Sequence, residues 1–562
     1  MHRRTVLLIL LVLAIVPYFV NLGATSIIDA NEAFYTETPR EMIERGDWIS
    51  TTFNYEPRLN KPPLSYWVVG AFYKVAGVSL CAARLPIALG MLVILLTVFL
   101  IGRAAWSIDA GLVAALTLAA TPRMLLFSRR IIIDMYTAMF AGLTLLCFVM
   151  AELEPARRRR WLAAMYVAVG LGVMTKGPVA AVLPAMVVGV YLVVAGRVRT
   201  LRRMMLPSGV LIVAAIVLPY YVALYARNGW AYISTFLLTE NLARFAEGVG
   251  APNRGPFFYV PVLFADLYFP WSLLLPLALM LVPWRAGLKG RGWRRLVSGG
   301  DDTEPVAQDR IRLLLGLWVV VIVGFFSLSK AQQDLYILPF VAAGAPMAGG
   351  LIVAAMDGRL AAAASRAARG LLGLACVLLG TVGALAAWFV GGNGQPIHLT
   401  GAAPAGLVVA AGAVAALVWT MRRQMLPAIA SLAGALVLAN GILVVWALPD
   451  FERYKPVPQL ARIIQQRAGP GAVVGMYKVP APSLVFYLRR HVTQMFDEAQ
   501  LQAFLTGHAE AYLVMTDDDF EAASRAVPTP LRIIARAPRF EAQLDDFLTR
   551  APLPNLLLVS NK

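Results

Sequence analysis

Long apolar segments separated by short polar ones run from the N-terminus to about residue 449. A helix of about 20 apolar residues crosses the hydrocarbon core of a bilayer. Segments that approach or exceed this length, two of them short, cover residues 5–22, 83–102, 109–127, 134–151, 161–175, 179–195, 207–226, 259–283, 312–328, 335–356, 370–391, 404–421 and 425–448. The pattern predicts a polytopic α-helical membrane protein with about 13 transmembrane helices.

One polar stretch follows directly after the first apolar segment, in the predicted loop 23–82. Its first part holds carboxylates, amides, a lysine and several aromatic residues between two predicted spans. Tyr35 and Met42 lie on one side at helical spacing, which predicts an amphipathic helix on the membrane surface. Pro39 leaves open whether this is one kinked helix or two short ones. A second amphipathic segment begins at Lys61-Pro62-Pro63.

The character of the chain changes at residue 450. Four short apolar runs, at 473–477, 511–515, 531–534 and 556–559, are typical of buried strands. Helical patterns at 483–489, 497–506 and 519–526 lie between them. We therefore expect two domains: a transmembrane domain over 1–449, including the loop 23–82, and a small α/β domain over 450–562 that acts as a lid or scaffold.

Composition and charge agree with a membrane protein and set its orientation. The chain is 59% hydrophobic and 15% charged, and its net charge is +18. Nucleic acid is not the expected partner, because the basic residues fall in short loops between spans. These loops include Arg3–Arg4, Arg157–Arg160 and Arg422–Arg423. If the spans alternate, they share one side, which the positive-inside rule assigns to the cytoplasm.

The same alternation places a second set of basic residues on the outer side, against the usual bias. These residues are Lys61, Lys176, Arg244, Arg254 and Lys330. Positive charge kept on that face indicates an anionic ligand. A snorkelling lysine is the simpler explanation for Lys61, and both explanations can hold.

Carboxylates on the outer side are the candidates for acid–base chemistry. Asp29 precedes Glu32 with capping-box spacing, so Asp29 is either an N-cap or a functional carboxylate. Asp134 stands at the mouth of a predicted span, where an acidic residue is costly unless it is paired or functional. Pairing with Arg129 or Arg130 is the simpler explanation for Asp134.

Several motifs resemble a known family. They are Glu32-Ala33-Phe34-Tyr35, Arg40-Glu41-Met42, Gly46-Asp47-Trp48, Lys61-Pro62-Pro63, Asp134, Met174-Thr175-Lys176-Gly177 and Tyr336-Ile337-Leu338-Pro339. In this order they are similar to the bacterial 4-amino-4-deoxy-L-arabinose transferases of lipid A (ArnT) and to the protein O-mannosyltransferase-like enzymes of the GT-C fold. The likeness runs over residues 1–450, and the C-terminal domain fits the same plan.

The resemblance implies a glycosyltransferase of the bacterial inner membrane that takes a monosaccharide from a polyprenyl-phosphate donor on the periplasmic face. The acceptor would be a lipid A-like lipid, a glycan or a protein. Lys61 would hold the donor phosphate with Arg244 and Arg254, and Lys330 and Tyr336 are further candidates for this role. Tyr35 and Lys176 complete the predicted surroundings of the site.

Three amides depart from the family pattern. Asn31 stands where the family commonly has Asp, Asn60 where it has Glu, and Asn253 where the aminoarabinose enzymes have His. Amides are poor replacements for zinc ligands, so we do not expect a bound zinc ion. An oxygen-bound Mg²⁺ is compatible with the residues present.

We expect an inverting transfer in which a carboxylate takes the acceptor proton while cations stabilise the leaving phosphate. Asp29 is the first candidate for this base, Asp134 the second and Glu32 the third. Two other classes compete with this function. A transporter should show two matching halves with broken helices, and the sequence lacks such a repeat. An inactive glycan- or lipid-binding relative would retain the motifs without turnover.

The charge asymmetry predicts a cytoplasmic N-terminus and a periplasmic C-terminal domain. A reporter fused after residue 450 should therefore give a periplasmic signal. A cytoplasmic signal would shift the span count by one and would place the loop 23–82 on the wrong side of the membrane.

Overall fold

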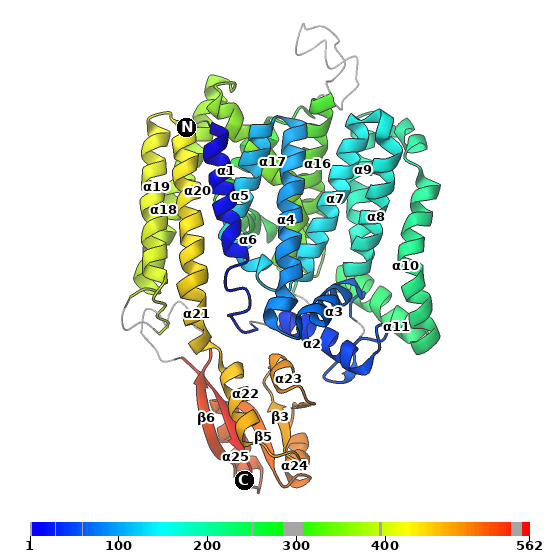
Figure 1. The fold of residues 1–562 in the computed structure, drawn as a ribbon, viewed down its shortest axis with the longest axis vertical. Helices are drawn as coiled ribbons and strands as arrows, with labels where there is room; N and C mark the ends of the chain where they lie inside the picture. Colours follow the sequence, from blue (N-terminus) through cyan, green and yellow to red (C-terminus); the bar gives the residue numbers. More distant parts are fainter. Residues whose placement is uncertain are drawn as a thin grey trace.

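The computed structural model describes residues 3–27, 30–58, 60–248, 252–284, 307–392, 396–540 and 553–562. Long helices pack side by side in the upper part of Figure 1, and a sheet covered by helices forms the lower part. Two helices of the first polar loop, α2 (Ala30–Arg45) and α3 (Leu64–Ala76), lie across the lower edge of the helical part.

The helical part begins with α1 and continues as a series of antiparallel helices. The longer ones are α1 (Arg3–Ile15), α4 (Leu80–Ala105), α5 (Ile108–Ala120), α7 (Ile133–Leu153), α8 (Arg158–Lys176), α9 (Val179–Val194), α10 (Leu206–Asn228), α16 (Ala307–Ser327), α17 (Val341–Met356), α18 (Ala362–Phe389), α19 (Ala402–Met421) and α20 (Met425–Ile442). Shorter helical pieces connect them: η1 (Val16–Tyr18), α6 (Pro122–Ser128), η2 (Pro155–Arg157), η3 (Val198–Arg203), α11 (Trp230–Ser234), η4 (Thr235–Ala243), α12 (Arg244–Glu247), α13 (Tyr259–Pro261), η5 (Val262–Leu267), η6 (Trp271–Leu274), α14 (Leu275–Met280), η8 (Asp334–Phe340), η9 (Leu443–Ala447), α21 (Leu448–Phe451) and η10 (Glu452–Tyr454).

Fewer helices than predicted are suited to cross a membrane by themselves. Among the described residues, 8 helices are long and apolar enough to cross a membrane. The number is 9 if α5 and α6, which are bent by 70° relative to each other, count as one span. This count by length and composition does not confirm the predicted thirteen spans. Helices α1 and α9 are short, α8 begins with three arginines, and the segment predicted at 259–283 is broken into several pieces.

Close helix packing uses small residues, as is common in membrane proteins. Helices α18 and α19 approach each other at Gly383 and Gly406. A Cβ atom added at Gly383 would lie 2.6 Å from the Gly406 carbonyl oxygen. A larger residue there would therefore push the two backbones apart.

The first polar loop forms one continuous helix where the sequence left two possibilities open. Helix α2 includes Pro39 and runs without a break. It leads into a two-stranded hairpin, β1 (Thr52–Phe53) with β2 (Glu56–Pro57), and then into α3. Helix α3 begins directly after Lys61-Pro62-Pro63, as the pattern predicts.

A fully buried arginine holds the entrance to α2. The side chain of Arg84, on α4, is 0% exposed, and its Nε donates to Glu32 Oε1 over 2.7 Å. Its other nitrogens donate to the carbonyl oxygens of Leu22, Thr25 and Ser26. Arg84 therefore joins the segments on both sides of residues 28–29, which lie outside the described part of the chain.

The C-terminal segment folds as an α/β unit. Its sheet has the order β4-β3-β5-β7-β6, in which β3 is parallel to β4 and β5, and β7 is antiparallel to β5 and β6. The strands and helices are β3 (Val473–Tyr477), β4 (Thr493–Met495), β5 (Ala511–Thr516), β6 (Arg532–Pro538), β7 (Asn555–Ser560), α22 (Pro456–Arg467), α23 (Ser483–Leu488), α24 (Glu498–Thr506) and α25 (Asp517–Ala526). Strands β3, β5, β6 and β7 fall on the four predicted runs, whereas β4 and α22 were not predicted.

This unit contacts the first polar loop. The Asn54 side chain exchanges two hydrogen bonds with the backbone of Val492. The Tyr487 hydroxyl accepts from the Ile27 backbone N–H, and the Lys455 ammonium donates to the Ser26 carbonyl. The segment before α2 is therefore fixed from two directions, by Arg84 and by the C-terminal unit.

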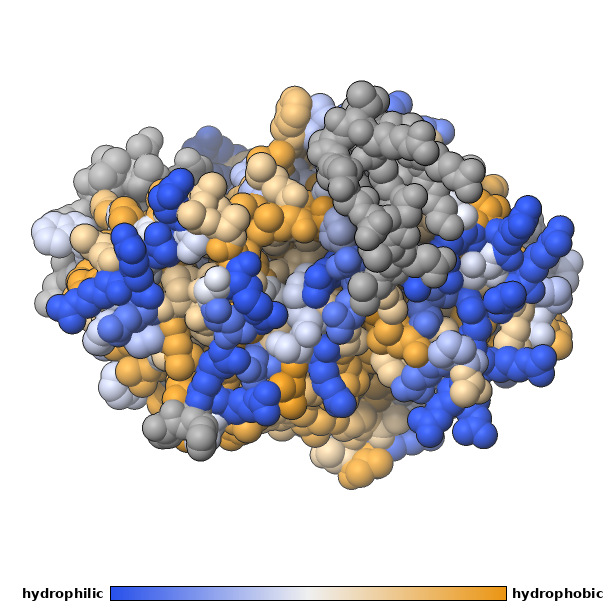
Figure 2. Space-filling model, turned by 90° about the horizontal axis from the view of Figure 1, so that it is seen from above, coloured by the Kyte–Doolittle hydropathy of each residue, from blue (hydrophilic) through white to orange (hydrophobic). Residues whose placement is uncertain are grey.

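Hydrophilic side chains are spread over the face that carries the N-terminus, which Figure 2 shows from above. Ion pairs join the helix ends on this face. Arg3 pairs with Asp109 and with Asp357, and Glu152 pairs with Arg158 and Arg197. These contacts connect α1 to α5 and to the end of α17, so the basic residues of this face also tie helices together.

The Arg84 contacts predict a large loss of stability on substitution. Arg84→Met would remove the buried guanidinium that pairs with Glu32, and removing one member of a buried pair costs about 3–5 kcal/mol. Thermal unfolding of the detergent-solubilised variant should therefore show a midpoint well below that of the wild type. Arg366→Met, at an exposed arginine of α18, is the control and should leave the midpoint nearly unchanged. Equal midpoints for Arg84→Met and the wild type would contradict this reading.

Candidate functional site

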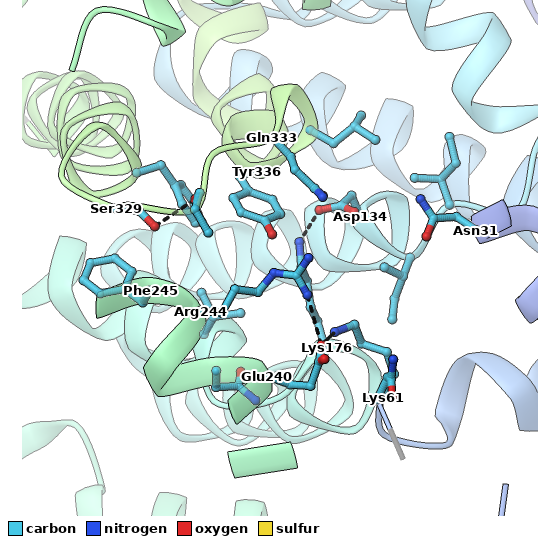
Figure 3. A pocket seen from close by; sticks show the side chains of 18 of the residues that line it. Asn31, Lys61, Asp134, Lys176, Glu240, Arg244, Phe245, Ser329, Gln333 and Tyr336 are labelled. Atoms are coloured by element: carbon cyan, nitrogen blue, oxygen red, sulfur yellow. Dashed lines mark hydrogen bonds and ion pairs between the residues drawn. The ribbon is translucent and has the colours of Figure 1, made fainter. Parts of the chain in front are cut away.

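A cavity of about 960 Å³ opens at the lower end of the helical part. Its wall comes from the start of α2, the loop before α3, the α6–α7 connection, the α8–α9 turn, η4, α12 and η8. Charged and aromatic side chains from these distant segments point into it (Figure 3). Among the described lining residues, the cations are Arg58, Lys61, Arg123, Arg130, Lys176, Arg244 and Arg254, and the anions are Asp134, Glu240 and Asp334. The wall is therefore more positive than negative.

Two cations meet on one carboxylate oxygen at one side of the cavity. Lys61 Nζ lies 3.1 Å from Glu240 Oε2, and Arg244 Nη1 lies 3.0 Å from the same atom. Glu240 and Arg244 are one turn apart, whereas Lys61 arrives from the other side (Figure 3). Burial lowers the pKa of Lys61, and the neighbouring Glu240 partly offsets this effect.

A second ion pair stands beside the first. Asp134, in the first turn of α7, pairs with Lys176 at the end of α8. The Lys176 ammonium also lies 4.5 Å from the centre of the Tyr336 ring, which is a cation–π contact. Arg129, a predicted partner of Asp134, instead donates to the carbonyl oxygens of Pro17 and Val20. Lys176 therefore fixes the position of the Asp134 carboxylate.

Aromatic rings support the wall nearest to α2. Tyr35 and Tyr66 stack with their ring centres 5.2 Å apart. Burial raises the pKa of both hydroxyls, so both stay protonated at neutral pH. The Arg58 guanidinium lies 3.5 Å from the centre of the Phe34 ring. This stacking holds a cation at the cavity edge on an aromatic surface.

A third charged group closes the opposite part of the wall. Arg123 pairs with Asp334 over 2.7 Å and with Asp266 over 2.9 Å. Its guanidinium also lies 4.3 Å from the centre of the Phe127 ring. Two carboxylates therefore neutralise Arg123.

Most of the predicted site residues gather at this cavity. Asp134, Lys61, Arg244, Arg254, Tyr336, Asn31, Tyr35, Asn60 and Lys176 all line it. Asp29 lies outside the described residues, two positions before Asn31. The structure thus joins segments that range from Asn31 to Tyr336 in the chain.

Three predicted residues lie elsewhere. Glu32 points away to Arg84 and is almost fully buried there. Lys330 is exposed and does not line the cavity, although the neighbouring Ser329 does. Asn253 also lies outside the lining, and its side chain accepts a hydrogen bond from the Gly255 backbone. A catalytic group must reach the reacting atoms, so we remove Glu32 from the candidates for the base.

The sequence did not single out four lining residues, Arg58, Arg123, Glu240 and Asn241. The sequence could have predicted Glu240, because it lies four residues before Arg244, and side chains at this spacing on a helix are neighbours. Asn241, rather than Asn253, is the amide that this outer segment brings to the cavity. No sequence motif includes Arg58 or Arg123, and only the packing of distant helices places them at the cavity.

The described lining residues do not fit a zinc site. Asn60 and Asn241 offer amides, and Glu240 is engaged by two cations. No group of three or more His, Cys, Asp or Glu side chains that could hold a metal occurs within the described part of the chain. Zinc prefers thiolate, imidazole and carboxylate ligands, and this set provides too few of them.

Comparisons with known proteins show which proteins this chain is similar to. A family profile described as dolichyl-phosphate-mannose-protein mannosyltransferase matches residues 60–222. The undecaprenyl phosphate-alpha-4-amino-4-deoxy-L-arabinose arabinosyl transferase 1 of Pseudomonas fluorescens is 30% identical over 387 residues, which cover 68% of this chain and 65% of that protein. The transferase of the same description from Pectobacterium carotovorum is 28% identical over 344 residues, which cover 60% of this chain and 56% of that protein. The chain thus spans between 56% and 65% of the length of these relatives.

A solved structure shares the whole fold. The crystal structure of ArnT from Cupriavidus metallidurans bound to undecaprenyl phosphate matches with a TM-score of 0.76 and 22% sequence identity. The match covers 99% of this chain and 98% of that chain. The fold is therefore that of a multi-pass membrane protein of the GT-C class. Within this class the chain is ArnT-like, and the resemblance that the motifs indicate is confirmed.

Proposed function

We propose that this protein is a glycosyltransferase that moves a monosaccharide from a polyprenyl-phosphate donor to an acceptor on the periplasmic face of the bacterial inner membrane. Lys61 and Arg244 hold the donor phosphate, and Arg254 adds positive charge at the same cavity. The fold and the relatives support this class of reaction. The relatives are described as transferases of undecaprenyl phosphate-alpha-4-amino-4-deoxy-L-arabinose. The proposed donor is therefore an amino sugar or another monosaccharide on such a lipid.

The convergence of Lys61 and Arg244 on a single anionic oxygen carries the proposal. Two cations that meet within hydrogen-bonding distance of one oxygen form the geometry that a phosphate oxygen requires. The cavity wall continues from these cations to the apolar side chains of Val179, Val182 and Leu237. A lipid phosphate needs this combination, because its head is charged and its chain is apolar.

The transfer requires one bond to form as another breaks. The acceptor oxygen or nitrogen bonds to the anomeric carbon, while the bond from that carbon to the phosphate oxygen breaks and its electron pair leaves with the polyprenyl phosphate. A carboxylate takes the acceptor proton. Lys61 and Arg244 stabilise the charge that develops on the leaving phosphate.

Asp29 and Asp134 are the candidates for the proton acceptor. Asp29 lies outside the described residues, two positions before Asn31 of α2, which lines the cavity. Asp134 lines the cavity itself, but Lys176 already occupies its carboxylate. We therefore keep Asp29 as the base and give Asp134 the role of a second, cation-held carboxylate.

Transfer from a radiolabelled polyprenyl-phosphate sugar tests the function and the base together. The wild type in lipid vesicles should label a lipid A-like acceptor, and Asp29→Asn should lower turnover by roughly 10²–10⁴-fold, the usual contribution of a general base. Asn caps a helix as well as Asp does, so unfolding of the variant should match that of the wild type. Asp134→Asn is the matched comparison. Near-normal turnover for Asp29→Asn together with loss of turnover for Asp134→Asn would show that Asp134 is the base. An inactive wild type would contradict the transferase function and favour an inactive binding protein.

The lowered pKa of Lys61 predicts a pH dependence of phosphate binding. The ammonium loses its proton at a lower pH than that of an exposed lysine, so affinity for undecaprenyl phosphate should fall as pH rises toward the alkaline range. Lys61→Arg should remove this fall, because a guanidinium stays charged. Lys61→Met should weaken binding at every pH. Scintillation or thermal-shift titrations across pH would measure the effect, and an identical alkaline fall in Lys61→Arg would rule out Lys61 as its source.

A further inference from the structure

Glu240 occupies an unusual position for a carboxylate in a phosphate site. Its Oε2 atom is the single meeting point of Lys61 and Arg244, at 3.1 and 3.0 Å. The side chain of each of the three residues is about one-fifth exposed, so the cluster is neither free in water nor locked in the core. Glu240 lies on η4, a π-helical segment, and Arg244 begins the next helix one turn later. The carboxylate thus stands where an anionic ligand oxygen would bind the same two cations.

The charges of substrate and product differ in a way that this carboxylate can sense. A polyprenyl-phosphate sugar is a phosphodiester with one negative charge. The polyprenyl phosphate that leaves is a monoester, which carries close to two charges at neutral pH because its second pKa is about 6. Two cations without a counter-ion would therefore hold the product more tightly than the donor.

We propose that Glu240 is a positioning residue that competes with the lipid phosphate for Lys61 and Arg244. This inference rests on the proposed function and concerns how the same site releases its product. With Glu240 paired, the three side chains carry one net positive charge, which matches the monoanionic donor. After transfer, the carboxylate competes for both cations with the dianionic product and promotes its release.

The neighbouring groups agree with an exchange of partners. Lys61 and Arg244 come from two separate segments, the loop before α3 and the start of α12, and Glu240 joins them. Two other cations of the wall have carboxylate partners of their own: Lys176 pairs with Asp134, and Arg123 pairs with Asp334 and Asp266. Displacement of Glu240 by a phosphate would therefore change two ion pairs and leave these others intact.

Glu240→Gln is the direct test, with undecaprenyl phosphate as the probe. Removing the competing charge should tighten undecaprenyl phosphate binding by about ten-fold or more. In the transfer assay the same variant should show a lower KM and a lower kcat, together with stronger inhibition by added undecaprenyl phosphate, because product release becomes slow. Glu240→Asp keeps the charge and should restore part of the wild-type release. Glu247→Gln is the control, because Glu247 is an exposed carboxylate at the end of α12. It should leave the affinity for undecaprenyl phosphate, KM and kcat unchanged.

The outcomes separate this inference from the proposed function. If the wild type does not bind undecaprenyl phosphate and Lys61→Met changes nothing, the proposed function fails. If the wild type binds and Lys61→Met does not, but Glu240→Gln binds equally or more weakly, the function stands and Glu240 is only a structural partner. Weaker binding would mean that Glu240 helps to place the two cations for phosphate, which would overturn the competition proposed here.

Discussion

A charge taken out of water needs a partner, and this requirement organises the lower half of the helical part. Arg84 has no exposed surface, and its nitrogens meet Glu32 and several carbonyl oxygens of the segment before α2. The described residues 19–27 of that segment form turns and irregular structure rather than a helix or strand. The cost of leaving a buried guanidinium unpaired therefore sets the path of the chain into α2 and, with it, the position of Asn31 at the cavity.

The cavity uses the same requirement in a looser form. Its ion pairs are less deeply buried than that of Arg84, so each can exchange one partner for another more readily than Arg84 can. Lys176 with Asp134 and Lys61 with Arg244 and Glu240 are pairs of this kind. A site for a charged lipid head requires this arrangement, because cations must be held in place between turnovers and must still be available to a phosphate. The contrast between Arg84 and Lys61 is thus one of burial, from fully enclosed to partly open.

The sequence predicted which residues gather at the cavity where they stand next to span ends. Lys61, Asp134, Lys176 and Tyr336 all line the cavity at the lower side of the helical part, and the alternation of spans is enough to bring them to one side. It could not show which side chains pair. The partner of Asp134 was expected at Arg129 or Arg130, but Lys176, 42 residues away, pairs with it. Glu32 was expected near the chemistry, and a distant arginine on α4 instead holds it in the protein interior. Pairing of this kind depends on helix packing, which hydrophobic periodicity does not encode. The count of helices that are long and apolar enough to cross is lower than the predicted number of spans for a related reason, because apolar length along the sequence does not show where a helix breaks or ends.

A structure of the protein with undecaprenyl phosphate bound tests the central claim most directly, namely that Lys61 and Arg244 form the phosphate site. The account predicts a phosphate oxygen within about 3 Å of both Lys61 Nζ and the Arg244 guanidinium, the ordinary distance for such hydrogen bonds. It also predicts that Glu240 has moved off at least one of these cations. A phosphate bound elsewhere, with Lys61 and Arg244 still joined through Glu240, would contradict the account.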